Sequence, residues 1–240
     1  MTTIATRPAT PATRPATPAT RPATPTRRPT RPTHADLRTL TATERRGARL
    51  AGASLLVLTL VSLPAAALLG GAAAPGDRAT RVGIGLAFLV VAVLDVVAAW
   101  GLHLLLRRRA TPASTAQLVS RSGYAVLLAG AAVVLTWPGG AGTVGFERDW
   151  SLALVVFGLH LVIAGIALWR SRIAPKAVAV ITAVAGLAYL LDDVLTRAAD
   201  VTVTPYLVPL MLGELVLLGW LLRTSRRPRV PATAAAVGAA

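Results

Sequence analysis

Three ionisable side chains lie in the middle of long apolar runs and are the first candidates for chemistry. They are Asp95, His160 and Glu214, in runs at about 82–106, 150–169 and 205–222. A charge at the centre of a bilayer costs about 3 kcal/mol even on insertion scales, so such groups face the interior of a helix bundle and often mark ion or proton paths. There, an imidazole and a carboxylate can share a charge-assisted hydrogen bond. We therefore predict an intramembrane polar cluster in which His160 meets Glu214, with Asp95 as the second candidate. The alternative is that each residue bonds separately to a backbone carbonyl, a hydroxyl or water.

Six apolar runs supply the elements that would hold this cluster. Their approximate bounds are 50–71, 82–106, 121–138, 150–169, 177–194 and 205–222, in a chain of 240 residues that is 54% hydrophobic. About 20 residues of helix cross a hydrocarbon layer of about 30 Å, and the bilayer offers the backbone no outside hydrogen-bond partner. No run alternates with the period of two that a membrane β-barrel requires. The expected fold class is all-α, a polytopic transmembrane bundle of six helices.

The basic residues predict how the bundle is oriented. The chain has 25 basic and 10 acidic residues, and the segments outside the runs alternate in charge. The odd-numbered segments hold 21 basic residues, when Arg121 at the first position of the third run is counted with them, and the even-numbered ones hold four. Positive segments tend to stay in the cytoplasm, so we expect a plasma-membrane protein with both termini cytoplasmic. Asp192 and Asp193 then become acids of the outer interface. Because the net charge of +15 lies in tails and connections, we do not expect nucleic acid as a partner.

The N-terminal tail repeats a unit of seven residues, TRPATPA, over residues 6–26. Frequent proline removes backbone donors and prevents helix or sheet, so residues 1–45 are expected to be a disordered basic tail. The transmembrane domain follows at 46–223 and a short cytoplasmic tail at 224–240. The N-terminal tail is either a spacer or a segment attracted to anionic lipid headgroups, at about 1 kcal/mol per arginine near the surface. The first run also resembles a secretory signal, but the long basic region before it favours an uncleaved span.

Signals for cofactors, metals and catalysis are weak. The chain has no cysteine, which excludes disulfides and thiolate sites. The stretch Gly140–Gly145 matches a dinucleotide fingerprint, but it lies between two membrane runs and is expected to be a turn. A haem bridged by His103 and His160 is excluded because about 12 Å of helix separates them. We expect no cofactor, no metal and no enzyme activity.

Small residues recur at the spacing of helix–helix contacts in membranes. They are Ala48 with Gly52, Gly158 with Gly165, and Ala179 with Ala183. These positions predict close packing of helices and carry no functional information.

Several motifs together resemble one family. They are Phe157–Leu161 with Gly165, Trp169–Pro175, and Ala185–Asp192, followed by Gly213-Glu214-Leu215 in the last run and preceded by Leu94–Arg108. This pattern resembles the domain-of-unknown-function 4386 (DUF4386) family of bacterial integral membrane proteins, over about residues 45–223. Arg172 stands where that family usually has a small residue. The resemblance implies a membrane bundle and no particular reaction, substrate or cofactor.

Three hypotheses about function follow. The first is a multi-pass membrane protein without catalytic activity, whose buried polar residues serve helix packing while its surfaces meet the bilayer and unknown protein partners. The second is a small-solute or proton-coupled transporter that uses the Asp95, His160 and Glu214 cluster. The third is a membrane enzyme, which lacks any recognisable catalytic motif.

Overall fold

The computed structural model describes residues 40–70, 77–137, 142–199 and 212–226. This part of the chain is helical and contains no strand. Its six helices are α1 (Ala42–Gly70), α2 (Arg78–Leu106), α3 (Thr111–Thr136), α4 (Gly142–Ser171), α5 (Lys176–Ala199) and α7 (Gly213–Ser225). The all-α fold class predicted from the sequence is therefore confirmed.

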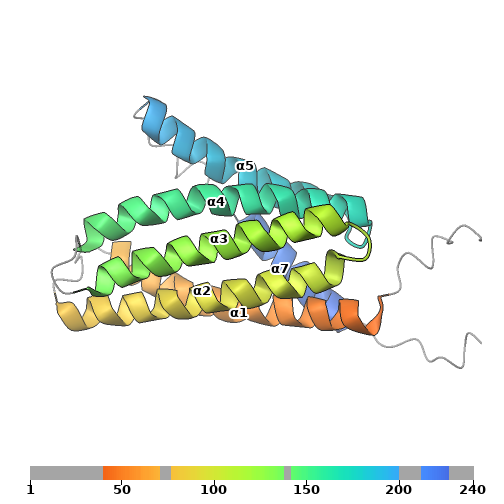
Figure 1. Cartoon of the computed structure of the whole chain (residues 1–240), viewed down its shortest axis with the longest axis horizontal. Coiled ribbons are helices and arrows are strands. Elements are labelled where there is room, and N and C mark those ends of the chain that lie inside the picture. The colour runs from red at the N-terminus through yellow and green to blue at the C-terminus, as the bar shows by residue number, and fades with distance from the viewer. Residues whose placement is uncertain (1–39, 71–76, 138–141, 200–211, 227–240) are drawn as a thin grey trace, which may run out of the picture.

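The helices form a ring around a common interior. Helices α1 to α5 follow one another up and down, each packed on the next, as Figure 1 shows from α1 at the bottom to α5 at the top. Helix α7 packs against both α1 and α5 and closes the ring. A side chain that points inward from one helix can thus reach helices that are not its neighbours.

Side chains fix the ends of several helices. Thr41 and Glu44 form a reciprocal capping box at the start of α1, with the Thr41 N–H donating to the Glu44 carboxylate at 2.7 Å. Asp77 caps α2: the hydroxyl and the N–H of Thr80 both donate to its carboxylate and hold the pKa of Asp77 below its usual range. Pro112 lies in the first turn of α3, where its missing N–H costs nothing.

Glycines allow the helix backbones to approach closely at two interfaces. A Cβ on Gly47 would lie 2.5 Å from the carbonyl oxygen of Gly101, where α1 meets α2. On α4, a Cβ on Gly158 would lie 2.9 Å from the Gly186 carbonyl, and one on Gly165 would lie 2.7 Å from the Ala179 carbonyl. The small residues predicted at 158, 165, 179 and 183 do form the α4–α5 contact.

The outward faces of the helices are apolar. Leu60, Val93 and Val126 expose 64%, 65% and 70% of their surface, and five of the described helices are long and apolar enough to cross a membrane. The sixth predicted run lies partly outside the described residues, which hold only its second half as α7. Exposed apolar surface on this scale favours lipid as the surroundings. The chain is a multi-pass membrane protein.

Several boundaries differ from those predicted, and helix α1 begins at Ala42, eight residues before the first predicted run. Helix α3 begins at Thr111, ten residues before the predicted run. Its first turns contain polar residues, so the apolar run alone did not include them. Helix α4 begins at Gly142, so most of the dinucleotide-like stretch is the first turn of a helix and not a loop. Helix α5 ends at Ala199, five residues after the end of the predicted run, and Asp192 and Asp193 lie within it. The repeats of the N-terminal tail lie outside the described residues.

Candidate functional site: a buried charge cluster

Arg121 stands at the centre of a network of ion pairs inside the helix bundle. Its side chain is 0% exposed. Nε donates to Oδ1 of Asp95 at 2.8 Å, and Nη2 donates to the same oxygen. Nη1 lies 2.8 Å from Oε1 of Glu214 and 3.1 Å from Nε2 of His160. We call these four residues, Asp95, Arg121, His160 and Glu214, the Arg121 cluster.

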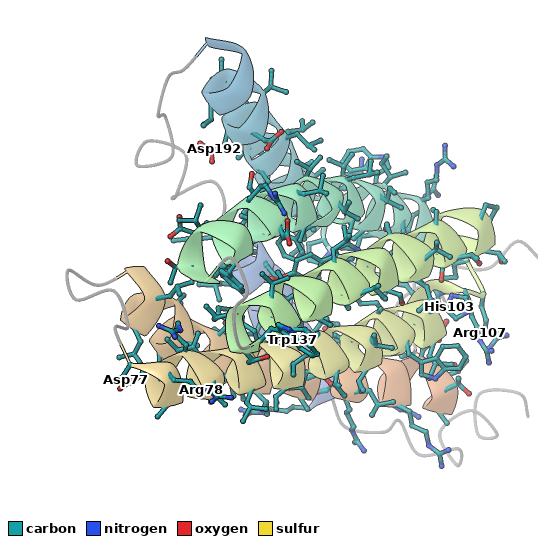
Figure 2. All side chains as sticks on the ribbon, turned by 60° about the vertical axis from the view of Figure 1, so that its left-hand side comes forward. Asp77, Arg78, His103, Arg107, Trp137 and Asp192 are labelled. Carbon is teal, nitrogen blue, oxygen red and sulfur yellow. The ribbon has the colours of Figure 1, made fainter. Side chains whose placement is uncertain are left out.

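The four residues come from four helices and lie at one depth. Three members lie 11 residues before the last residue of their helix: Asp95 in α2, His160 in α4 and Glu214 in α7. Arg121 lies 10 residues after the first residue of α3. These four helix ends are at the same side of the bundle, where His103 and Arg107 are seen in Figure 2. At 1.5 Å per residue, the cluster is about 15–17 Å from that end, near the middle of a bilayer core.

His160 meets the guanidinium and not a carboxylate. A guanidinium can only donate, so Nε2 of His160 accepts from Nη1 of Arg121. The ring is then neutral and carries its proton on Nδ1, which has no hydrogen-bond partner of good geometry. The direct pairing of His160 with Glu214 or Asp95, expected from the sequence, is replaced by contacts of all three residues with Arg121.

Aromatic rings cover one side of the cluster. The guanidinium carbon of Arg121 lies 5.7 Å from the centre of the Phe157 ring, which is within the range of a cation–π contact. Tyr124 and Tyr189 pack on the same ring, at centroid distances of 4.8 and 5.3 Å. One helical turn before Arg121 lies Gln117, which is fully buried and whose two amide atoms have no partner in the described residues. The guanidinium is therefore in contact with an aromatic ring, and an unsatisfied amide lies one turn away on the same helix.

The other predicted site residues lie at the ends of the bundle. Asp193 accepts a hydrogen bond of 3.3 Å from the hydroxyl of Ser151 and so links α5 to α4, while Asp192 lies beside it on α5 (Figure 2). His103 contacts the hydroxyl of Ser114 at 2.9 Å, between α2 and α3. No group of three or more His, Asp or Glu side chains in the described residues is placed to hold a metal ion.

Arg121, the central residue of the cluster, is not among the site residues that the sequence predicts. It was counted among the basic residues that flank the third run, because it stands at the first position of that run. A signal was available: Ser114, Gln117 and Arg121 follow at spacings of four or three residues, which places them on one helix face. With Pro112 as a typical first-turn residue, this pattern predicts a helix that starts ten residues earlier and carries Arg121 inward.

Comparison with known proteins gives one match. Residues 143–224 match the family model described as "Domain of unknown function (DUF4386)". The family resemblance noted in the sequence is confirmed for this part of the chain. The DUF4386 match covers α4, α5 and α7 and so includes His160 and Glu214, while Asp95 and Arg121 lie before it. No curated protein and no solved structure matches the chain.

Proposed function

We propose that the Arg121 cluster serves to hold the transmembrane helices together, and that the chain has no catalytic activity of its own. One observation carries this proposal: a single buried guanidinium contacts side chains from three other helices, α2, α4 and α7. Its contact with Glu214 crosses the interior of the ring, since α7 packs on α1 and α5. The protein's surfaces, and not its core, then meet lipid or protein partners.

The energetics of buried ions make this proposal testable. Removing one partner of a buried ion pair leaves an uncompensated charge and costs about 3–5 kcal/mol, whereas replacing the whole set with apolar side chains is often neutral. We expect Arg121→Met to lower the free energy of unfolding in detergent micelles by about that amount. The triple variant Asp95→Leu, Arg121→Met, Glu214→Leu should recover most of the loss. A triple variant as unstable as Arg121→Met would contradict a packing role.

A second candidate function is proton-coupled transport, and a different observation favours it. The cluster pairs one guanidinium with two carboxylates, and the Glu214 side chain is 21% exposed. Ionisable groups at mid-membrane often belong to ion or proton paths.

Flux through vesicles separates the two candidates. The packing proposal expects that an imposed pH gradient decays equally fast in vesicles with the purified protein and in empty vesicles, as read by an internal pH-sensitive dye. Faster decay that Glu214→Gln abolishes and the matched surface change Glu147→Gln leaves intact would instead establish transport. Glu147 is exposed at the opposite end of α4 from Ser171.

We further propose a plasma-membrane location with both termini in the cytoplasm. Because Arg121 lies inside the bundle, it does not belong to a connecting segment. The segments on the predicted inner side then hold twenty basic residues and those on the outer side hold four. Arg46 and Arg49 are exposed at the start of α1, where they can attract anionic lipid headgroups.

A further inference from the structure

Arg121 binds its two carboxylates unequally. Asp95 accepts from both Nε and Nη2, and its side chain is 2% exposed. Within the described residues Glu214 has one ion-pair contact, to Nη1, which meets the distance of an ion pair but not the angles of a hydrogen bond. Its side chain is 21% exposed. The guanidinium is therefore bound more tightly to Asp95, which accepts two hydrogen bonds, than to Glu214, which makes one ion-pair contact.

The charges of the cluster do not balance if both acids are ionised. His160 is neutral because its Nε2 accepts from Arg121. One guanidinium and two carboxylates then leave one uncompensated negative charge. The medium around it has a low dielectric, where unpaired charge is strongly disfavoured.

Among the residues that the structure describes, no other charged side chain on the neighbouring helices supplies the missing cation. The titratable groups that face the cluster are Tyr124 on α3 and Tyr189 on α5, both neutral phenols. Helix α1 has no ionisable residue from Leu50 to Gly70. Every other basic residue of the described helices is near a helix end. A small cation from outside the chain is needed for neutrality.

We infer that the Arg121 cluster is a site for one exchangeable proton, carried by Glu214. In the protonated state Oε1 of Glu214 keeps its place 2.8 Å from Nη1, while Oε2 carries the hydrogen. Releasing the proton to solvent leaves Glu214 as a carboxylate and the cluster with one negative charge. This inference goes beyond the packing role proposed above and does not require that the protein transports anything.

The test is infrared spectroscopy of the purified full chain at a series of pH values. A protonated carboxyl group has a C=O stretching band that a carboxylate lacks. We expect such a band near neutral pH, its loss as the pH rises, and its absence in Glu214→Gln. Asp95→Asn should also remove it, because one guanidinium and one remaining carboxylate balance. The surface variant Glu147→Gln should keep it.

Conservative variants assign the band to one residue without removing any charge. Glu214→Asp should shift its frequency, and Asp95→Glu should leave the frequency unchanged. The amide bands of each variant report whether it has folded. A band that follows Asp95 would overturn the assignment to Glu214. Absence of any pH-sensitive carboxyl band in the folded wild type would overturn the proton site itself, and a carboxylate band that responds to sodium would then identify a metal cation as the missing charge.

Discussion

At the scale of single residues, Gln117 is the least satisfied side chain of the described core. It is fully buried, and neither its amide oxygen nor its amide nitrogen has a hydrogen-bond partner among the described residues. A buried polar group without a hydrogen bond costs about 1–3 kcal/mol, while an apolar group of similar shape costs nothing of this kind. Gln117 lies one helical turn from Arg121, so its polarity adds to that of the cluster without being paired with it.

We predict that Gln117→Leu stabilises the protein by about 1–3 kcal/mol, because the substitution removes an unsatisfied buried amide. The measurement is the free energy of unfolding in detergent micelles. Gln117→Asn keeps the amide and should give no gain. If Gln117→Leu lowers stability instead, the amide is satisfied by a bound water or another molecule.

Three of the four members of the Arg121 cluster could be predicted from the sequence, but the fourth member and the geometry could not. Asp95, His160 and Glu214 were visible because each interrupts an apolar run, and the structure brings all three to one guanidinium. Arg121 was hidden because an arginine at the edge of an apolar run reads as a flank of the membrane. Whether such a residue lies inside the helix bundle or in a connecting segment depends on where the helix starts. That is decided by capping and by partners on other helices, which hydropathy does not measure.

At the scale of helices, the α4–α5 contact depends on glycine at both crossing positions. A Cβ on Gly186 would clash with the carbonyl oxygen of Gly158 and lie 2.7 Å from the backbone nitrogen of Val162. Both obstacles are backbone atoms, so no side chain can rotate away. Small residues at such positions are what hold helices together in lipid, where no hydrophobic force favours association.

We predict that Gly186→Ala lowers the free energy of unfolding by about 1–3 kcal/mol, the usual cost of overpacking. Gly219→Ala on α7 is the matched control, because its new Cβ would meet nothing within 4 Å. It should leave stability unchanged or slightly raise it, since alanine favours helix over glycine. Equal losses in the two variants would show that the close contact is not the cause.

The turn after α4 contains a backbone conformation that suits glycine. Arg172 has a φ of 55°, and its side chain is exposed. This is also the position where the DUF4386 pattern usually has a small residue. A left-handed residue with a Cβ costs about 1–2 kcal/mol, and the greater freedom of glycine in the unfolded chain offsets about 0.5–1 kcal/mol of that.

We predict that Arg172→Gly stabilises the protein by about 0.5 kcal/mol, the difference between these two effects. Thermal unfolding in micelles is the measurement. Arg172→Ala removes the same charge but keeps the Cβ, so it should give no such gain. Equal stabilisation by alanine would show that the arginine side chain, and not the backbone, is responsible.

At the scale of the whole molecule, the ring explains why charge could be buried. The six described helices each touch their neighbours and enclose an interior that long side chains must fill. The sequence predicted the number of runs and the class of fold, because apolar runs of membrane length leave the backbone no other choice. It could not predict that α7 closes the ring against α1 and α5, since that depends on contacts between segments far apart in the chain.

The orientation of the ring in the membrane follows from its two ends. One end carries Arg107, Arg108 and Arg109 between α2 and α3, and the other carries few basic residues, so the basic end is expected in the cytoplasm. The chain has no cysteine, so the labelling of an introduced single cysteine has no background from native thiols. Val144 near the start of α4 is 74% exposed and Thr115 near the start of α3 is also exposed. In intact cells, Val144→Cys should react with an impermeant thiol reagent and Thr115→Cys should react only after the membrane is opened. Labelling of Thr115→Cys alone in intact cells would reverse the orientation.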